Sequence, residues 1–288
     1  MYDQAENLRR QMQRSEAKIG RSIAVVSGKG GVGKSNFTIN FAYALIEKGQ
    51  KVLIFDMDIG MGNIHILLGE SPAGSLQQYL EGMKELSDVI QQTKDGLAFI
   101  SGGSGLETVM EWSESSFLRL IDAFSELQQA YDFILFDMGA GATTRVIELL
   151  VAVDEIIVLS TSEPTSITDA YSMMKFVCMK DLNKTFHLVG NRVTRGNDGQ
   201  DAMVRLQYAM RKFLDKETNI LGFLPEDPAV PAAVHVQRPY LFMYPNAPIS
   251  KRIRAIAEVF TNVETPESQT GSERFLHKLK MIFWKEKI

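Results

Sequence analysis

Residues 28–35 read Gly-Lys-Gly-Gly-Val-Gly-Lys-Ser, and this stretch decides the fold. It fits the pattern G-x-x-x-x-G-K-[ST], in which successive backbone N–H groups surround the phosphates of a nucleotide. An apolar strand is predicted just before it, at 22–27, and an amphipathic helix just after it, at 34–48. A strand, a glycine loop and a helix are the setting that the pattern requires, so we expect the chain to bind a nucleoside triphosphate.

The loop assigns roles to individual residues. Lys34 is expected to contact the β- and γ-phosphates, and the Ser35 hydroxyl is expected to bind Mg²⁺. The positive end of the helix that follows favours the same anion. Backbone groups of the loop and of the first helical turn complete the expected contacts, at Gly30, Gly31, Val32, Gly33 and Asn36.

Apolar strands alternate with helical patterns along the chain. Further strands are predicted at 51–57, 97–101, 132–137, 155–161, 186–192 and 219–224. Further helices are predicted at 114–130, 143–152, 165–180, 199–215 and 250–260. This alternation predicts an α/β fold, in which a mostly parallel twisted sheet of about seven to eight strands has helices on both faces. One domain is expected over 22–260, with a polar segment at 1–21 before it and a flexible linker at 261–272 after it.

Aspartates follow two of the predicted strands. Strand 51–57 runs into Asp56 and Asp58, and strand 132–137 ends in Asp137. Ligands of parallel sheets bind at the carboxyl ends of strands, so these carboxylates are expected beside the phosphates. We expect Asp56 and Asp137 to join Ser35 at Mg²⁺, and Gly141 to donate its N–H to the γ-phosphate. A lone aspartate at a strand end is more often a cap or a turn former, but three after two strands favour function.

The composition restricts the other classes of function. The net charge is −4 and the isoelectric point is about 5.7, so the chain has no overall field that favours nucleic acid. Cys178 is the only cysteine, which rules out a disulfide or a cysteine-based metal cluster within one chain. No signal peptide opens the chain, and no apolar stretch reaches the length of a spanning helix. A cytoplasmic location is expected.

Three strings together resemble the deviant Walker A ATPases of the MinD/ParA type: the loop with its extra Lys29, DMDIGMGN at 56–63 and FDMGAG at 136–141. The resemblance implies a SIMIBI-type P-loop NTPase that forms an ATP-sandwich homodimer and hydrolyses ATP to ADP and phosphate, weakly and only as a dimer. It implies that Lys29 reaches the partner's nucleotide and stabilises transition-state charge, as an arginine finger does. It also implies that Asp58 positions the attacking water, so that Lys29, Lys34 and Asp58 are catalytic.

The resemblance extends to the nucleotide base. Asn191 and Arg192 match the adenine-contacting segment of the family, and its second wall is matched by Pro225, Glu226 and Asp227. An asparagine after a strand is also a common turn residue. Gly139 departs from the family, because many relatives carry proline there, and glycine loosens this switch loop.

The predicted last helix, 273–286, is amphipathic and basic. Its apolar side chains lie on one face, at Phe275, Leu276, Leu279, Ile282 and Phe283, and Lys278 and Lys285 are among its cations. A short basic amphipathic helix behind a linker is typical of a membrane-surface binder, although a final helix packed on the core has the same pattern. We expect 273–288 to bind anionic lipids weakly as one copy and more strongly as two copies in a dimer.

The segment before the first strand distinguishes subfamilies. Residues 3–9 read DQAENLR and resemble the DQAxxLR element of the flagellar-number regulators of the MinD family, the FlhG/FleN/YlxH type. Septum-placement MinD proteins begin almost at the first strand. The resemblance covers nearly the whole chain, including 238–250, and implies that the element activates the signal-recognition-particle-type GTPase FlhF. The expected contacts are Asp3, Gln4, Ala5, Leu8 and Arg9, and the Gln4 amide would orient the partner's attacking water. A disordered polar tail has a similar composition.

The leading hypothesis is an ATPase switch that regulates flagellar number and placement. It would be cytoplasmic with ADP or without nucleotide, and peripheral on the cytoplasmic face of the membrane as an ATP-bound dimer. FlhF, anionic lipids and flagellar C-ring components are its expected partners, and Mg²⁺ with ATP or ADP its cofactors. A septum-site MinD ATPase is the alternative. A DNA-partition ParA ATPase is disfavoured by the acidic isoelectric point and the amphipathic last helix, and iron–sulfur relatives need cysteines that this chain lacks.

Overall fold

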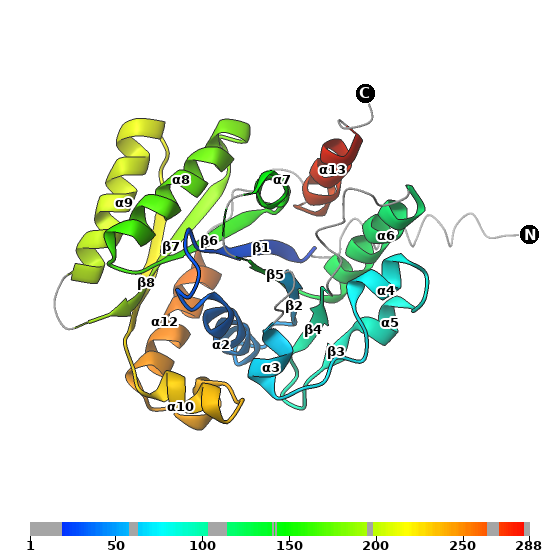
Figure 1. Ribbon diagram of the computed structural model, residues 1–288, viewed down its shortest axis with the longest axis horizontal. Coiled ribbons are helices and arrows are strands. Elements are labelled where there is room, and N and C mark those ends of the chain that lie inside the picture. Colours follow the sequence, from blue (N-terminus) through cyan, green and yellow to red (C-terminus); the bar gives the residue numbers. More distant parts are fainter. Residues whose placement is uncertain are drawn as a thin grey trace, which may run out of the picture.

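The computed structural model describes residues 19–57, 63–102, 114–139, 141, 143–194, 198–263 and 271–284. In these ranges eight strands form one sheet in the order β3-β4-β2-β5-β1-β6-β7-β8 (Figure 1). All neighbouring strands are parallel except β3 and β4, which are antiparallel. The strands are β1 Arg21–Val26, β2 Val52–Met57, β3 Gln91–Gln92, β4 Ala98–Ser101, β5 Phe133–Met138, β6 Glu155–Ser160, β7 Thr185–Val193 and β8 Asn219–Pro225.

Helices cover both faces of the sheet and divide the core into two layers (Figure 1). One layer lies under α4 Leu76–Leu80, α5 Leu86–Val89, α6 Glu114–Ala130, α7 Thr144–Ala152, α8 Pro164–Lys180, α9 Asp198–Leu214 and α13 Gly271–Trp284. The other lies under α2 Lys34–Ile46, α3 Ile64–Leu68, α10 Ala229–His235, α11 Tyr240–Met243 and α12 Pro248–Asn262. Successive side chains of a strand point to opposite faces, so Ala24 and Val26 join the first layer and Ile23 and Val25 the second.

The predicted α/β fold is confirmed. Each of the seven predicted strands is present, because a strand buried on both faces is a continuous apolar run that the sequence displays directly. The two-residue β3 and the short helices α3, α4, α5, α10 and α11 were not predicted. None of them is long enough to show a clear hydrophobic period.

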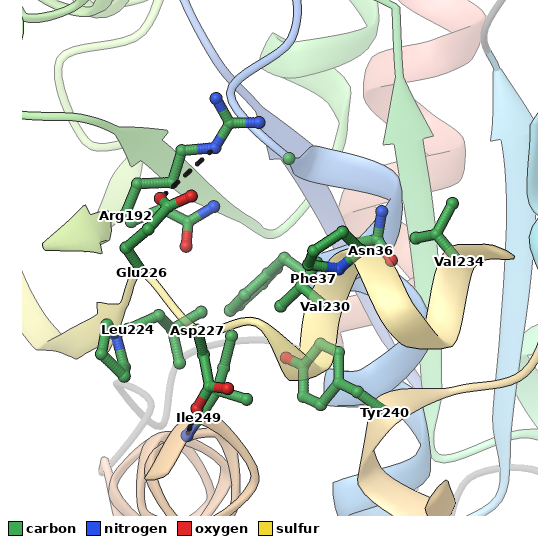
Figure 2. A pocket seen from close by; sticks show the side chains of 14 residues that line it. Asn36, Phe37, Arg192, Leu224, Glu226, Asp227, Val230, Val234, Tyr240 and Ile249 are labelled. Atoms are coloured by element: carbon green, nitrogen blue, oxygen red, sulfur yellow. Dashed lines mark hydrogen bonds and ion pairs between the residues drawn. The ribbon is translucent and has the colours of Figure 1, made fainter. Parts of the chain in front are cut away.

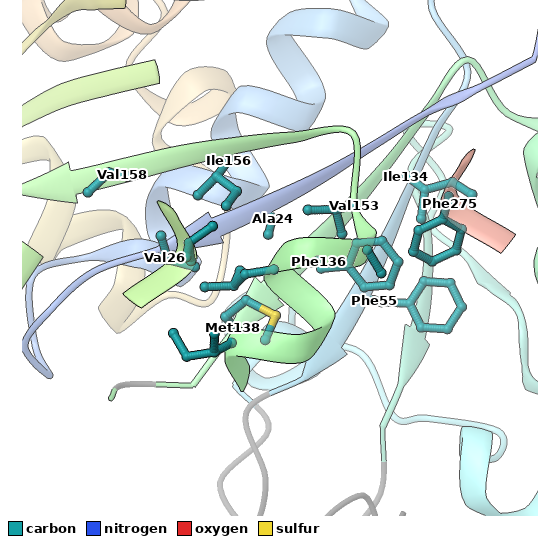
Figure 3. Packing of buried hydrophobic residues seen from close by; sticks show 14 of the residues in the cluster. Ala24, Val26, Phe55, Ile134, Phe136, Met138, Val153, Ile156, Val158 and Phe275 are labelled. Atoms are coloured by element: carbon teal, nitrogen blue, oxygen red, sulfur yellow. The ribbon is translucent and has the colours of Figure 1, made fainter. Parts of the chain in front are cut away.

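The last helix packs against the domain. The Phe275 side chain is fully buried, and its ring centroid lies 5.0 Å from that of Phe124 and 5.9 Å from that of Phe136 (Figure 3). Leu276 and Leu279 are partly buried against the same layer, and α13 contacts α6 and α7. In this conformation these three apolar residues are therefore not presented to a membrane, contrary to the expectation for a free amphipathic helix. The side chains of Ile282 and Phe283, and Lys285, lie outside the described residues.

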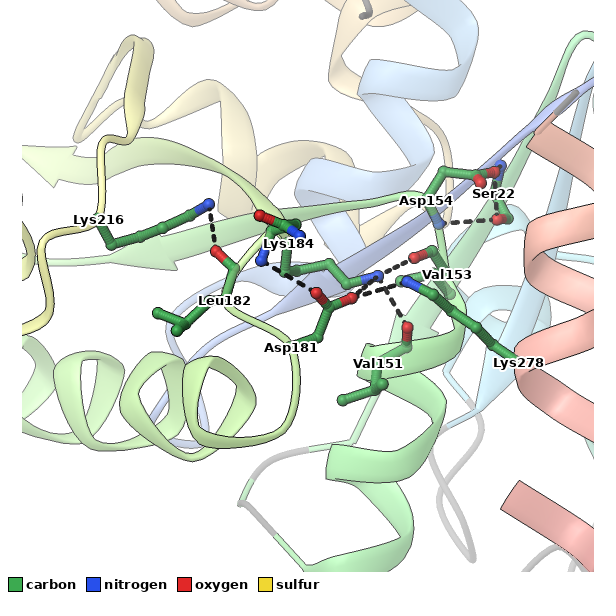
Figure 4. Close-up of polar contacts among 10 residues, drawn as sticks. Ser22, Val151, Val153, Asp154, Asp181, Leu182, Lys184, Lys216 and Lys278 are labelled. Atoms are coloured by element: carbon green, nitrogen blue, oxygen red, sulfur yellow. Dashed lines mark hydrogen bonds and ion pairs between the residues drawn. The ribbon is translucent and has the colours of Figure 1, made fainter. Parts of the chain in front are cut away.

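An ion pair fastens α13 to the end of α8. Lys278 Nζ donates to Asp181 Oδ2 at 2.7 Å, and Asp181 also lies 3.9 Å from the buried Lys184 ammonium (Figure 4). The Lys278 ammonium is the main favourable partner that holds the pKa of the Asp181 carboxyl below its usual value, against the opposing effect of burial. Among the described helices, none is long and apolar enough to span a bilayer.

Candidate nucleotide-binding site

The phosphate loop joins β1 to the first turn of α2. Gly31 and Gly33 have φ values of 75° and 99°, which favour glycine, and Gly33 caps α2. The Ser27 hydroxyl donates to the Lys29 carbonyl at 2.6 Å and so fixes the start of the loop. Lys34 is buried at the start of α2, where backbone N–H groups without helical partners favour an anion.

Two glycines of the loop allow close contact with neighbouring segments. A Cβ on Gly28 would lie 2.3 Å from the backbone at 169–170 in α8, a distance that requires the backbone to move. A Cβ on Gly33 would lie 2.7 Å from Asn191 Nδ2, which itself donates to the Val32 carbonyl at 2.7 Å. The phosphate loop is therefore packed between α8 and β7. Asn191, which was predicted to contact the base, also holds the phosphate loop in place.

Asp137 provides a test of whether the site fits a divalent cation. Its carboxylate is fully buried, and Oδ1 accepts a hydrogen bond from Thr38 Oγ1 at 3.0 Å. Within the described residues Oδ2 is buried and has no hydrogen-bond partner. A buried carboxylate oxygen beside a phosphate loop and the Ser35 hydroxyl fits Mg²⁺, because the cation would supply the missing partner. Thr38 was not predicted.

Asp56 lies next to Asp137 in the sheet. The two residues are paired in the register of β2 and β5, and Asp56 is buried with Oδ2 accepting from the Ile64 N–H at 3.1 Å. Asp56 therefore positions the chain that leaves β2, in addition to any contact with a hydrated cation. Asp58 lies outside the described residues. Gly141 has a φ of 107°, so the predicted switch position is one that glycine favours.

The protonation of Asp137 predicts how Mg²⁺ binding depends on pH. The pKa of Asp137 is raised to about 7, mainly by burial and in part by the neighbouring Asp56, while hydroxyl groups and Lys34 oppose the increase. Below pH 7 the cation must displace a proton, so its apparent affinity should fall by up to about tenfold per pH unit. Above pH 7 the affinity should level off.

Calorimetric Mg²⁺ titrations of the ADP-loaded chain between pH 6 and 8 test this dependence. The nucleotide phosphate also titrates, so the Asp137→Asn variant is the matched control, and the difference between the two slopes reports the carboxyl group. Equal slopes in the two proteins would contradict the assignment.

A cavity of about 320 Å³ opens beside the end of the phosphate loop (Figure 2). This volume lies in the range of small-molecule sites. Five residues expected from the sequence line it together with Gly33 and Asn36: Asn191, Arg192, Pro225, Glu226 and Asp227. Arg192 has an unusual φ of 54°, and its Nε lies 4.0 Å from a Glu226 carboxylate oxygen across the cavity (Figure 2). The predicted phosphate-binding and base-binding segments therefore border one continuous site.

Asp227 has a structural role in the cavity wall. Its two carboxylate oxygens accept from the Ala229 N–H at 2.9 Å and from the Ile249 N–H at 3.2 Å, so they fix the starts of α10 and α12. The apolar lining of the cavity was not predicted from the sequence. It comes from α2, α10, α11, α12 and β8 and comprises Phe37, Leu224, Val230, Pro231, Val234, Tyr240 and Ile249. The stretch 238–250 resembles the family, but nothing in its sequence predicted which of its residues line the cavity.

Lys29 lies outside the phosphate cradle of its own chain. Its ammonium forms an ion pair with Glu163 at 3.0 Å, and the two side chains are 49% and 60% exposed. Glu163 is the residue before α8, and its role was not predicted. The arrangement differs from that of Lys34, which is buried at the loop.

Comparisons with known proteins agree with this geometry. The family model for ParA, described as "NUBPL iron-transfer P-loop NTPase", matches residues 18–261. The antiactivator FleN of Pseudomonas aeruginosa is 32% identical over 253 residues, which cover 88% of this chain and 90% of FleN. The flagellum site-determining protein YlxH of Helicobacter pylori is 32% identical over 236 residues, which cover 82% and 80% of the two chains.

A solved structure with bound nucleotide is also similar. The septum site-determining protein MinD of Pyrococcus horikoshii OT3, complexed with Mg-ADP, has a TM-score of 0.69 and 26% identity. The similarity covers 85% of this chain and 97% of that one. Together with the phosphate loop, the two strand-end aspartates and the eight-strand order, these matches show that the chain belongs to the ParA/MinD family of P-loop NTPases.

Proposed function

We propose that this chain is an ATPase switch that forms a homodimer with ATP, associates with the membrane, and regulates flagellar number and placement. The observation that carries the proposal is the 32% identity to FleN and to YlxH over at least four-fifths of each chain. The DQAENLR element at 3–9 supports the flagellar branch of the family. A cytoplasmic form and a peripheral membrane form would then be two states of one protein.

The chain's own residues supply the parts of a phosphoryl-transfer site. Lys34 and the loop N–H groups would bind the phosphates, and Asn191 and Arg192 would hold the base over the apolar cavity. Ser35 and Asp137 would hold Mg²⁺, which neutralises charge on the phosphates when it is bound. We assign the positioning of the attacking water to Asp58 on the basis of the family resemblance.

The Lys29–Glu163 pair suggests how dimerisation begins. For Lys29 to reach a second protomer's nucleotide, its ammonium must leave Glu163. Exposed ion pairs contribute only about 0–1 kcal/mol, so exchange of Glu163 for phosphate oxygens has a low cost. The Lys29–Glu163 ion pair is consistent with a monomer in which Lys29 does not contact nucleotide.

The position of α13 suggests how nucleotide would control membrane binding. Helix α7 begins at Thr144, three positions after the switch residue Gly141, and α13 packs on α7. A movement of 139–141 toward a γ-phosphate would therefore shift the surface on which Phe275 and Leu279 are docked. We propose that the docked state is the cytoplasmic form, and that the ATP-bound dimer releases two α13 helices to anionic lipid.

The N-terminal element gives the experiment that tests the flagellar assignment. Gln4→Ala in the full chain should lower stimulation of FlhF GTPase activity by about tenfold or more, because an amide that orients the attacking water is lost. Deletion of residues 1–18 should abolish the stimulation while ATP hydrolysis by the domain is retained. GTP turnover by purified FlhF is the measurement, and Gln13→Ala is the matched control. Full stimulation by the deleted chain would contradict the role of the element.

A septum-site ATPase is the second candidate, because MinD of Helicobacter pylori is 26% identical over 230 residues. Under that alternative the wild-type chain would not stimulate FlhF at all. Iron transfer is disfavoured, since Cys178 is buried and is the only cysteine of the chain.

A further inference from the structure

A buried lysine lies where the end of α7 meets the loop between α8 and β7. Lys184 belongs to this loop and is only 2% exposed. Its Nζ donates to the Val151 carbonyl at 2.9 Å and also to the Val153 carbonyl (Figure 4). Carbonyls in the last turn of a helix have no helical N–H partner, and a lysine is a common substitute. Lys184 therefore caps the carboxyl end of α7.

A second lysine, from α13, approaches the same place. Lys278 Nζ donates to Asp181 Oδ2 at 2.7 Å, and Lys184 Nζ lies 3.9 Å from that same oxygen atom (Figure 4). The Asp181 carboxylate can neutralise only one of the two positive charges, and the shorter contact belongs to Lys278. Docking of α13 therefore brings a second cation to a buried one, and the two compete for one carboxylate.

The other charged groups around the buried lysine have partners of their own. Asp154, between α7 and β6, accepts from the Ser22 N–H and hydroxyl at 2.8 and 2.6 Å, and so it attracts the lysine only at longer range. Lys180 on α8 and Glu148 on α7 lie 3.5 Å from each other. Lys216, after α9, donates to a backbone carbonyl of the loop at 2.7 Å. The competition therefore involves mainly the two lysines and Asp181.

A neutral amine fits the docked site better than an ammonium does. An ammonium has three N–H donors and no acceptor. In the described part of the chain, two of these donors on Lys184 meet the α7 carbonyls, and Asp181 is paired with Lys278. A neutral amine donates the same two hydrogen bonds and carries no charge to repel Lys278. The pKa of Lys184 is accordingly lowered to about 7, mainly by burial and in part by Lys278, while Asp181 and Asp154 oppose the decrease.

We infer that docking of α13 is linked to the loss of a proton from Lys184, and that protonation of this lysine favours departure of the helix. When α13 leaves, Lys278 no longer occupies Asp181, so the carboxylate can pair with Lys184 and water can reach the site. Both changes stabilise the charged form and raise the pKa of Lys184 above about 7. The undocked chain then binds more protons than the docked chain at pH 8.

The sign of the pH dependence follows from this difference in bound protons. Between pH 7 and the higher pKa of the undocked form, docking releases a proton, so it should weaken as the pH falls, by up to about tenfold per pH unit. Below pH 7 Lys184 is charged in both forms, and the dependence should level off. The exposure of α13 would therefore respond to pH just above neutrality.

The α7 carbonyls connect the proton to the nucleotide switch. Helix α7 begins three positions after Gly141, and Val151 and Val153 are at its other end. If α7 moves, these carbonyls move away from Lys184, and Asp181 becomes its remaining acceptor. Nucleotide and proton would then act on the same competition. This connection to membrane release rests on the function proposed above, whereas the linkage between the proton and docking does not.

Hydrogen exchange of the full chain without nucleotide, between pH 6.5 and 8.5, tests the inference. The measured rates are corrected for the intrinsic pH dependence of amide exchange. The protection of amides in α13 should then fall by up to about tenfold per unit as the pH decreases from 8.5 to 7, because undocking exposes them. The amides of α12 are the internal control, and their protection should not change.

Two substitutions of Lys184 alter its charge in opposite directions. Lys184→Met is neutral at every pH and should keep α13 protected throughout. Lys184→Arg is charged at every pH, keeps donors for the α7 carbonyls, and should lower the protection throughout. The exposed Lys180 gives the matched control Lys180→Met, which should follow the wild-type chain. Thermal unfolding of each variant shows whether the domain is intact, and the two substitutions test the inference independently.

Constant protection of α13 in the wild-type chain, or a wild-type pH dependence in Lys184→Met, would overturn the inference. Capture by phosphatidylglycerol vesicles over the same pH range tests the membrane role separately. Protection of α13 that depends on pH, without vesicle capture in any nucleotide state, would support the proton linkage and contradict the membrane role proposed above.

Discussion

ATP turnover by Lys29→Ala is expected to fall by about 10³-fold or more, the range found when a charge supplied to the transition state from another chain is removed. Lys29 is half exposed and is held by Glu163, whereas Lys34 is buried at its own phosphate loop. The Lys29 ammonium in that position is not part of the phosphate site of its own chain. In the proposed dimer it would reach the nucleotide bound by the second protomer.

Phosphate release and light scattering in ATP test this expectation together. Lys29→Ala should remain monomeric in ATP, while the wild-type chain forms dimers and both proteins bind nucleotide. The exposed Lys48, after the far end of α2, gives the matched control Lys48→Ala. Normal turnover by a dimeric Lys29→Ala protein would show that the lysine does not act across the dimer.

Asp58→Ala is expected to lower hydrolysis by about 10²-fold or more while ATP binding is retained. The residue comes two positions after Asp56, which is paired in register with Asp137 at the candidate Mg²⁺ site. Loss of a group that orients water slows the chemical step without removing contacts to the phosphates. The ATP-bound dimer should therefore accumulate, because in the proposed cycle hydrolysis releases it.

Binding of a fluorescent ATP analogue, phosphate release and particle mass separate these effects. The exposed Asp95 provides the control Asp95→Ala, for which all three quantities should match the wild-type chain. Wild-type turnover by Asp58→Ala would remove this residue from the mechanism, and loss of ATP binding would assign it to the nucleotide pocket instead.

The predictable part of the fold and site is the part encoded locally. The phosphate loop and each central strand, including the one that ends in Asp137, are short contiguous stretches of sequence. Residue pattern and spacing within each stretch were therefore enough to predict them. The base cavity is assembled from distant segments: Phe37, Tyr240 and Ile249 come from three helices, and nothing in the surrounding sequence distinguishes them from core residues. The Lys29–Glu163 pair was missed for the same reason, because its partners are 134 positions apart.

The last helix shows a different limit. A stripe of apolar residues with lysines around it predicts burial of that stripe, but it does not distinguish a membrane from the rest of the protein. The structure places Phe275 among Phe124 and Phe136 and pairs Lys278 with Asp181. The same apolar face of α13 can pack on the protein in one state and on a membrane in another, and this is the basis of the proposed switch.

Co-sedimentation with phosphatidylglycerol vesicles tests the central claim most directly. The wild-type chain should be captured with ATP and remain in solution with ADP. Asp181→Ala removes the partner of Lys278, weakens docking of α13, and should be captured with ADP as well. Equal capture of the wild-type chain in ATP and ADP, or no capture in either, would contradict a nucleotide-controlled release of α13.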